Sequence, residues 1–224
     1  MRLGGCMKAC SFFLASSILI ASFVFTTGVN AKEIELIQLP APQTQAGKPL
    51  MQALQERKSS RAFSNKELSL QVISDMLWAA CGINRQESGL KTAPSTMNMQ
   101  EIDIYVSMVE GLYLYDAKAN KLIPVLAQDI RALTGKQDFV ASAPVNLIYV
   151  ANLAKMSKLP EQDAQFYAAV DTGFISQNVY LYCASAGLAT VVRGMIDISL
   201  LTTVMQLKKD QKIILSQTIG YPAN

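Results

Sequence analysis

The spacing of apolar residues predicts several helices along the chain. The clearest of them follows Ser69, a residue type that caps helix N-termini, and keeps its apolar side chains at helical spacing as far as Gly82. The longest covers residues 161–186, a stretch with one glycine and no proline. We expect helices over residues 49–58, 70–81, 128–133, 161–186 and 199–207.

Alternating and β-branched stretches predict strands between these helices. Residues 102–109 alternate, whereas residues 145–151 form a continuous apolar run, which is typical of a strand at the centre of a sheet. Residues 111–115 and 121–125 flank a polar turn and predict a hairpin. The remaining expected strands cover residues 190–193 and 212–219.

The order of these elements indicates the fold class. Helices come first, then a hairpin, then strands that alternate with helices, so we expect an α+β layer fold and not a regular βαβ series. Residues 85–100 are polar and predict a loop that leads into a short turn. An extended arm rich in Pro and Gln is expected at residues 32–48, and a single domain with one core at residues 49–224.

The N-terminal segment has the features of a removable signal peptide. Arg2 and Lys8 precede an apolar stretch that ends in Val29-Asn30-Ala31, a pattern of small residues suited to signal peptidase. Translation from Met7 would give a signal of the same kind, and a core helix at the chain terminus is the alternative. The apolar run is too short to cross a membrane comfortably. We therefore expect a signal over residues 1–31, export to the periplasm or secretion, and no stable membrane span afterwards.

Charge and composition narrow the chemistry. Loss of Arg2 and Lys8 with the signal lowers the formal net charge from +3 to +1, so no nucleic-acid partner is expected. The chain has no histidine, which excludes Ser-His-Asp and Cys-His hydrolases and the usual zinc sites that contain histidine. We expect no metal site. If the chain is an enzyme, a bound cofactor carries the difficult chemistry.

Cys81 and Cys183 are the cysteines that remain after signal removal. Both lie in apolar, helix-like stretches, so buried free thiols are expected. Export would also permit a disulfide between them, and the sequence leaves this alternative open.

A first candidate motif is Arg57-Lys58-Ser59-Ser60-Arg61-Ala62-Phe63, at the end of a predicted helix. Its cations and hydroxyls could hold a phosphate dianion through charge-assisted hydrogen bonds. The alternative is a solvated basic helix end that complements the helix dipole.

A second candidate motif is Pro94-Ser95-Thr96-Met97-Asn98-Met99-Gln100, just before a predicted strand. Its side chains both donate and accept hydrogen bonds, so they could recognise a ring that carries carbonyls and ring nitrogens. A capped turn is the alternative.

A third candidate motif is Gly187-Leu188-Ala189-Thr190-Val191-Val192-Arg193-Gly194-Met195. Gly187 could cap the long helix, and Gly194 would let the backbone approach a flat ligand closely. A plain connection between helix and strand is the alternative.

Together and in this order, the three motifs resemble the nitroreductase superfamily of flavoproteins. The spacing Arg57-x-Ser59-x-Arg61-x-Phe63 is similar to that family's Arg-x-Ser-x-Arg/Lys-x-Phe signature. The resemblance implies that Arg57, Lys58, Ser59 and Arg61 contact the phosphate, ribityl chain and ring edge of FMN. The loop from Pro94 to Gln100 resembles the family's Pro-Ser-x-x-Asn-x-Gln loop. Ser95 and Asn98 are therefore expected to line the flavin.

The resemblance extends to the end of the chain. Val191, Val192, Arg193 and Gly194 align with the segment that packs on the isoalloxazine, where backbone N–H groups reach its N5 side. Arg193 stands where many nitroreductases carry an acidic residue. The helix containing Asp171-x-Gly173 resembles the family helix that supplies much of the dimer interface. The closing Ile219-Gly220-Tyr221-Pro222 is also similar to the family.

One stretch is similar to a particular branch of the family. The segments Gly111-Leu112-Tyr113-Leu114-Tyr115-Asp116 and Leu122-Ile123-Pro124-Val125 resemble the branch that includes the thiazoline and oxazoline dehydrogenases of peptide natural products. We take this as kinship of sequence and not as proof of that reaction.

The resemblance implies a three-layer α+β fold, with a mixed or antiparallel central sheet flanked by helices, in a homodimer. It also implies FMN-dependent ping-pong transfer of hydride or electrons at flavin N5. The substrate would be a small nitroaromatic, quinone or azoline-like molecule, and NAD(P)H is a possible donor. Substrate oxidation with reoxidation by oxygen or a quinone is one alternative. A non-catalytic flavin-binding or interaction module of the cell envelope is the other.

Overall fold

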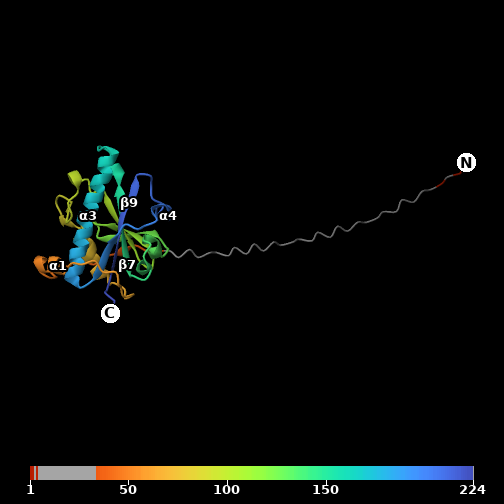
Figure 1. Cartoon of the computed structure of the whole chain (residues 1–224). Coiled ribbons are helices and arrows are strands. Elements are labelled where there is room, and N and C mark those ends of the chain that lie inside the picture. The colour runs from red at the N-terminus through yellow and green to blue at the C-terminus, as the bar shows by residue number, and fades with distance from the viewer. Residues whose placement is uncertain (3, 5–33, 224) are drawn as a thin grey trace. The chain divides into compact units, whose positions relative to one another are not determined.

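The structure is a computed structural model of the chain and describes residues 1, 2, 4 and 34–223 (Figure 1). The predicted signal peptide, residues 1–31, lies outside the described residues apart from Met1, Arg2 and Gly4. Its cleavage, and the export that depends on it, therefore stay predictions. The described residues 34–223 belong to one compact unit. Within the described part, no helix combines the length and the apolar character needed to cross a membrane.

A seven-stranded antiparallel sheet is the middle layer of the described residues. The strands lie in the order β1-β6-β5-β4-β7-β9-β8, which places β8 at one edge. Their bounds are β1 (Ile37–Gln38), β4 (Ile102–Ser107), β5 (Leu112–Asp116), β6 (Lys121–Leu126), β7 (Val145–Asn152), β8 (Ala189–Arg193) and β9 (Gln211–Gly220). All but the last residue of β7 are buried, so its apolar run is confirmed as an inner strand.

Helices cover both faces of this sheet. The helices α1 (Leu50–Glu56), α2 (Leu70–Cys81) and α3 (Glu161–Ala186) belong to one side, where α2 and α3 share a core with the sheet. Figure 1 shows α3 along one side of the sheet and α4 (Ile198–Val204) on the other. Leu201 of α4 packs there in a second, smaller core. The expected three-layer α+β fold is confirmed, and its sheet is antiparallel.

The helix boundaries follow the predicted capping residues. The Ser69 hydroxyl accepts a hydrogen bond from the backbone N–H of Val72 at the start of α2. Gly187 ends α3 with a φ of 69°, a left-handed conformation that glycine adopts without strain. Cys81 and Cys183 are buried free thiols, as expected, and burial raises the pKa of both.

The structure departs from the sequence predictions in short polar segments. The predicted loop at residues 85–100 contains most of a small hairpin, β2 (Ile83–Arg85) with β3 (Leu90–Lys91). Its side chains are exposed or half-buried, and so give no alternating apolar pattern. The predicted helix at residues 128–133 is instead a 3-10 turn, η2 (Arg131–Thr134). Three further turns have the bounds η1 (Thr96–Asn98), η3 (Asp138–Val140) and η4 (Leu153–Met156).

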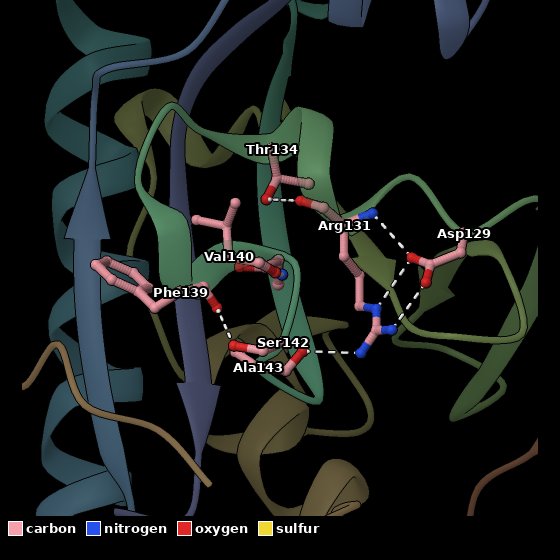
Figure 2. A network of polar contacts seen from close by, with 8 residues as sticks. Asp129, Arg131, Thr134, Phe139, Val140, Ser142 and Ala143 are labelled. Atoms are coloured by element: carbon pink, nitrogen blue, oxygen red, sulfur yellow. Dashed lines mark hydrogen bonds and ion pairs between the residues drawn. The ribbon is translucent and has the colours of Figure 1, made fainter. Parts of the chain in front are cut away.

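The turn at η2 has a local cause that Figure 2 shows. The Asp129 carboxylate accepts the backbone N–H of Arg131 at 3.0 Å and two N–H groups of its guanidinium at 2.9 and 2.8 Å. A side chain that bonds its own neighbouring backbone in this way competes with α-helical hydrogen bonding.

Candidate functional site

Tyr180 joins two of the three candidate motifs. Its hydroxyl accepts the backbone N–H of Val192 on β8 at 2.9 Å and lies 2.9 Å from Ser59 Oγ. The Arg57 guanidinium carbon lies 5.3 Å from the centre of the Tyr180 ring, a cation–π contact. The backbone N–H of Ser60 also donates to the carbonyl of Thr190 at 2.9 Å. The basic motif therefore lies along the free edge of β8.

Tyr180 itself was missed by the sequence reasoning. It lies within α3 and is half-buried. Nothing in the apolar spacing of a long helix distinguishes one tyrosine that faces a site from another that packs against a neighbouring helix. The only sequence signal available was its place in the long helix, which resembles the family helix.

A cavity of about 700 Å³ opens beside the basic motif. Lys58 and Ser60 line it, together with Gly187 and Thr190. In an extended segment neighbouring side chains point to opposite sides, so Ser59 reaches Tyr180 while Lys58 and Ser60 face the cavity. The volume is within the range of small-molecule and cofactor sites.

The basic motif that borders this cavity carries three cations, of which Lys58 lines the cavity itself. Arg57, Lys58 and Arg61 form no ion pair within the part of the chain that the structure describes. The nearby Glu56 is paired with Lys48, whose hydrogen bond lowers the pKa of the glutamate. The three cations are therefore available to an anionic ligand such as a phosphate.

The end of β8 offers open backbone groups. The backbone groups of Thr190 and Val192 that bond Ser60 and Tyr180 lie on the side of β8 away from β9. Backbone groups of every second residue in an antiparallel strand point to the same side, so the N–H of Gly194 is directed to this open edge as well. Gly194 is exposed, and a Cβ atom added there would meet one atom within 4 Å, Leu215 Cδ2 at 3.7 Å. A flat ring could lie against this edge.

The side chain of Arg193 points into the protein. It is 4% exposed, and it donates to Thr218 Oγ1 at 2.9 Å, to the carbonyl and hydroxyl of Thr134 at 2.6 and 3.2 Å, and to Asn146 Oδ1 at 2.9 Å. Burial lowers the pKa of Arg193 to about 10, so it stays protonated at neutral pH. The side chain of Arg193 therefore does not face the open edge of β8, and by the same alternation its backbone groups are directed towards β9.

A polar network holds the acceptors of Arg193 in place, as Figure 2 shows for the η2 and η3 turns. The Thr134 hydroxyl donates to the carbonyl of Arg131 at 2.8 Å, and the Arg131 guanidinium donates to the carbonyl of Ala143 at 3.0 Å. The Asn146 amide donates to the carbonyl of Val140 at 2.8 Å. The conformation of these turns therefore defines the pocket into which Arg193 fits.

The second candidate motif is ordered by α3. The Asp171 carboxylate accepts the backbone N–H of Thr96 at 2.7 Å and its hydroxyl at 3.3 Å. Within the loop, Ser95 Oγ accepts the N–H of Gln100 at 3.0 Å. Asn98 is exposed and has a φ of 54°, which asparagine tolerates better than most residues.

Ser95 and Asn98 do not meet the basic motif within one chain. Their loop is attached to α3 at Asp171, whereas the basic motif is attached at Tyr180. Helical geometry separates these two positions by about 13 Å along the axis and by about half a turn around it. The described residues thus form two separate groups of candidate site residues.

Glu101 is a buried carboxylate next to the second group. It is fully buried, and neither of its oxygens has a hydrogen-bond partner among the described residues. Burial raises the pKa of Glu101 to about 7, and the negative charge of Asp171 adds to the rise. No sequence pattern predicted the burial of Glu101, since a glutamate is usually exposed.

A family model and a curated relative both match this chain to nitroreductases. The Nitroreductase family matches residues 54–221. "Putative nitroreductase MJ1384" of Methanocaldococcus jannaschii is 31% identical over 170 residues, which cover 71% of this chain and 85% of that protein.

Solved structures agree with this match. A crystal structure of a "putative nitroreductase" from Ralstonia eutropha JMP134 has a TM-score of 0.81 and 44% sequence identity, over 84% of this chain and 90% of that one. Two more distant structures share the fold alone. A chain of the E. coli microcin synthetase McbBCD complex has a TM-score of 0.68 at 18% identity, over 93% of this chain and 85% of its own. A "putative nitroreductase" from Desulfovibrio desulfuricans in complex with FMN has a TM-score of 0.58 at 18% identity, over 80% and 89%.

Proposed function

Because this chain belongs to the nitroreductase family and is an oxidoreductase of that family, we propose that it works with FMN bound between the basic motif and the free edge of β8. The observation that carries the proposal is the Tyr180 hydroxyl, which lies 2.9 Å from both Ser59 Oγ and Val192 N. This contact brings cations that have no ion pair among the described residues close to the end of β8, where the N–H of Gly194 is directed to the open edge. The structure of the Desulfovibrio relative with FMN supports the choice of cofactor.

The basic motif would hold the phosphate end of FMN. Arg57, Lys58 and Arg61 have no ion pair within residues 34–223, and Lys58 faces the cavity. Ser59 and Ser60 add hydroxyl groups. A phosphate dianion held by several of these groups would gain charge-assisted hydrogen bonds.

The edge of β8 would orient the ring. Val192 and Gly194 direct their backbone groups to this edge, and Gly194 leaves room for close approach. Hydride transfer is the chemistry that FMN supplies when bound. Backbone N–H groups and the Arg61 side chain would stabilise negative charge on the ring electrostatically, which needs no histidine as acid or base.

The substrate is proposed to be a small nitroaromatic, quinone or azoline-like molecule. The fold likeness to a chain of the microcin synthetase complex is compatible with the azoline-like class. NAD(P)H is one proposed donor. Oxidation of a substrate, with oxygen or a quinone restoring the flavin, is favoured if the predicted export to the periplasm or medium occurs.

We further propose that the functional unit is a homodimer. Apolar side chains on one face of α3 are exposed, with Phe166 at 62%, Val170 at 37% and Phe174 at 43%. A second copy could cover this face. It could also bring its own Ser95 and Asn98 to the flavin, which one chain alone does not do.

The test is to produce residues 32–224, add FMN, remove the excess, and record the visible spectrum together with the mass in solution. A retained flavin spectrum on a dimer is the expected result. Anaerobic mixing with NADH and NADPH then separates the two donor hypotheses, because rapid bleaching by either nucleotide favours NAD(P)H. Colourless protein, or flavin-loaded protein that turns over no dye or quinone, would favour the non-catalytic module instead.

A further inference from the structure

We propose that the buried side chain of Arg193 raises the reduction potential of the flavin through its positive charge, without touching the flavin. This inference rests on the proposed function, since it requires FMN to lie along the edge of β8. It assigns to Arg193 a role that differs from the contact role expected for the cofactor-binding residues of its motif.

The first step is that Arg193 is a buried cation without a counter-charge. Its hydrogen bonds go to side-chain or backbone oxygens of Thr134, Asn146 and Thr218, all of which are neutral. No carboxylate pairs with it among residues 34–223. Buried charges in proteins are usually paired, so an arginine held by four hydrogen bonds to neutral acceptors is unusual.

The second step is that the charge is permanent at the pH at which the protein works. Although burial lowers the pKa of Arg193 to about 10, the guanidinium stays protonated at neutral pH. With 4% of the residue exposed, water and salt screen it less than they screen the cations of the basic motif.

The third step concerns position. Arg193 is the last residue of β8 and directly precedes Gly194, the proposed point of closest approach to the ring. Gly135 packs directly against the guanidinium, because a Cβ atom at this position would lie 1.8 Å from Arg193 Nη1. The N–H of Lys136 donates to the carbonyl of Met195 at 3.0 Å, which holds the segment after η2 against the segment after β8. Arg193 is thus bonded directly to the residue proposed to approach the ring, while its guanidinium is held by Thr134 of η2, Asn146 of β7 and Thr218 of β9.

The consequence is electrostatic. Reduction adds negative charge to a flavin, and a fixed positive charge close by, in a poorly screened interior, favours that addition. The bound flavin would then take electrons from a substrate more readily and give them to a weak acceptor less readily. This favours substrate oxidation over reduction of nitro groups as the physiological direction.

A purely structural role is the rival explanation. In that case Arg193 would only fasten β8 to the η2 turn through Thr134. Its loss would lower stability and leave the flavin potential unchanged. Variants that separate charge from hydrogen bonding distinguish the two roles.

The test uses three variants of the FMN-loaded protein at neutral pH: Arg193→Lys, Arg193→Gln and Asn146→Asp. Lysine keeps the charge and loses most of the hydrogen bonds, whereas glutamine removes the charge. The Asn146→Asp variant keeps the Arg193 guanidinium and places a negative charge beside it. It also loses the hydrogen bond from the Asn146 amide to the carbonyl of Val140. The reduction potential is measured by equilibration with a redox dye, and stability by urea unfolding.

We expect the potential to fall in Arg193→Gln and Asn146→Asp and to stay near wild type in Arg193→Lys. At the wild-type midpoint, the ratio of reduced to oxidised flavin should drop roughly tenfold in the two neutralised variants. Wild-type potential in folded, flavin-loaded Arg193→Gln or Asn146→Asp would overturn the inference. If Arg193→Gln does not fold, Asn146→Asp decides alone. Wild-type protein that holds no flavin would instead remove the proposed function, and this inference with it.

Discussion

The hydroxyl of Tyr180 accepts the backbone N–H of Val192 at 2.9 Å and so fastens α3 to the free edge of β8. The same oxygen lies 2.9 Å from Ser59 Oγ. One side chain therefore holds two segments that are more than a hundred residues apart in the sequence.

Replacing Tyr180 by Phe should weaken FMN binding about tenfold, because Ser59 and Val192 lose their common partner while the ring beneath Arg57 remains. Stability should fall by about 1 kcal/mol, the usual contribution of a hydrogen bond. Tyr182→Phe is the matched control, since its hydroxyl bonds Val72 on α2 at 3.3 Å. Flavin fluorescence titration and urea unfolding measure the two effects. Equal FMN affinity in both variants would contradict the assignment.

Replacing Lys58 by Ala should weaken FMN binding tenfold or more, since the variant loses a charge-assisted contact to the phosphate. The affinity for riboflavin, which lacks the phosphate, should change little. Lys118→Ala, an exposed lysine on the hairpin between β5 and β6, should change neither. Isothermal titration with both ligands tests this, and a parallel loss of riboflavin affinity would argue against a phosphate role.

Replacing Gly194 by Ala should leave the urea midpoint nearly unchanged, because the new methyl group meets only Leu215 Cδ2, at 3.7 Å. FMN affinity should nevertheless fall several-fold, since the methyl group would separate the ring from the backbone of β8. Gly135→Ala, in contrast, should lower the free energy of unfolding. Its Cβ atom would lie 1.8 Å from Arg193 Nη1, so the protein should be destabilised by several kcal/mol. Unaltered FMN binding in Gly194→Ala would count against the proposed ring position.

Glu101 should make stability depend on pH. Its pKa rises from 4.5 to about 7 on folding, so between these values the folded chain holds a proton that the unfolded chain releases. The free energy of unfolding should therefore fall as pH rises through this window, by at most about 3 kcal/mol in total. Glu101→Gln should remove that fall, whereas Glu110→Gln, at an exposed glutamate, should keep it. Urea unfolding between about pH 5 and pH 8 provides the measurement.

Replacing Val170 or Phe174 by Glu should produce monomers if a second copy covers the exposed face of α3, because a buried unpaired charge is costly. These monomers should also lose flavin, since Ser95 and Asn98 of the partner would be missing. Val125→Glu, at an exposed position of β6, is the control. Light scattering gives the mass, and the visible spectrum after removal of free FMN gives the retained flavin. A dimer that survives the Phe174 change would place the interface elsewhere.

Much of the fold could be predicted from the sequence, because the long elements carry strong periodic signals. The span of α3 matches the predicted residues 161–186 at both ends, where Pro160 precedes the helix and Gly187 closes it. The short hairpin of β2 and β3 and the turns at η3 and η4 were missed. Their side chains are held by local backbone and loop contacts, which leave no apolar pattern in the sequence.

The candidate site was predictable in part. The three motifs could be recognised together, and two of them meet in the structure through Tyr180. Their cofactor contacts remain predictions. The inward direction of Arg193 could not be foreseen, because its acceptors Thr134, Asn146 and Thr218 come from three separate elements. The contacts of Tyr180 with Ser59 and Val192 and the burial of Glu101 could not be foreseen for the same reason, because they arise from tertiary packing.

Asp171 and Tyr180 lie on opposite sides of α3, so the two groups of site residues would come from different copies in a dimer. Such a protein would allow complementation between two defective alleles. Each proposed pocket takes its cations from one copy and its Ser95 loop from the other. A chain defective at Arg61 and a chain defective at Asn98, each inactive alone, would then form mixed dimers in which one of the two pockets is built entirely from intact parts.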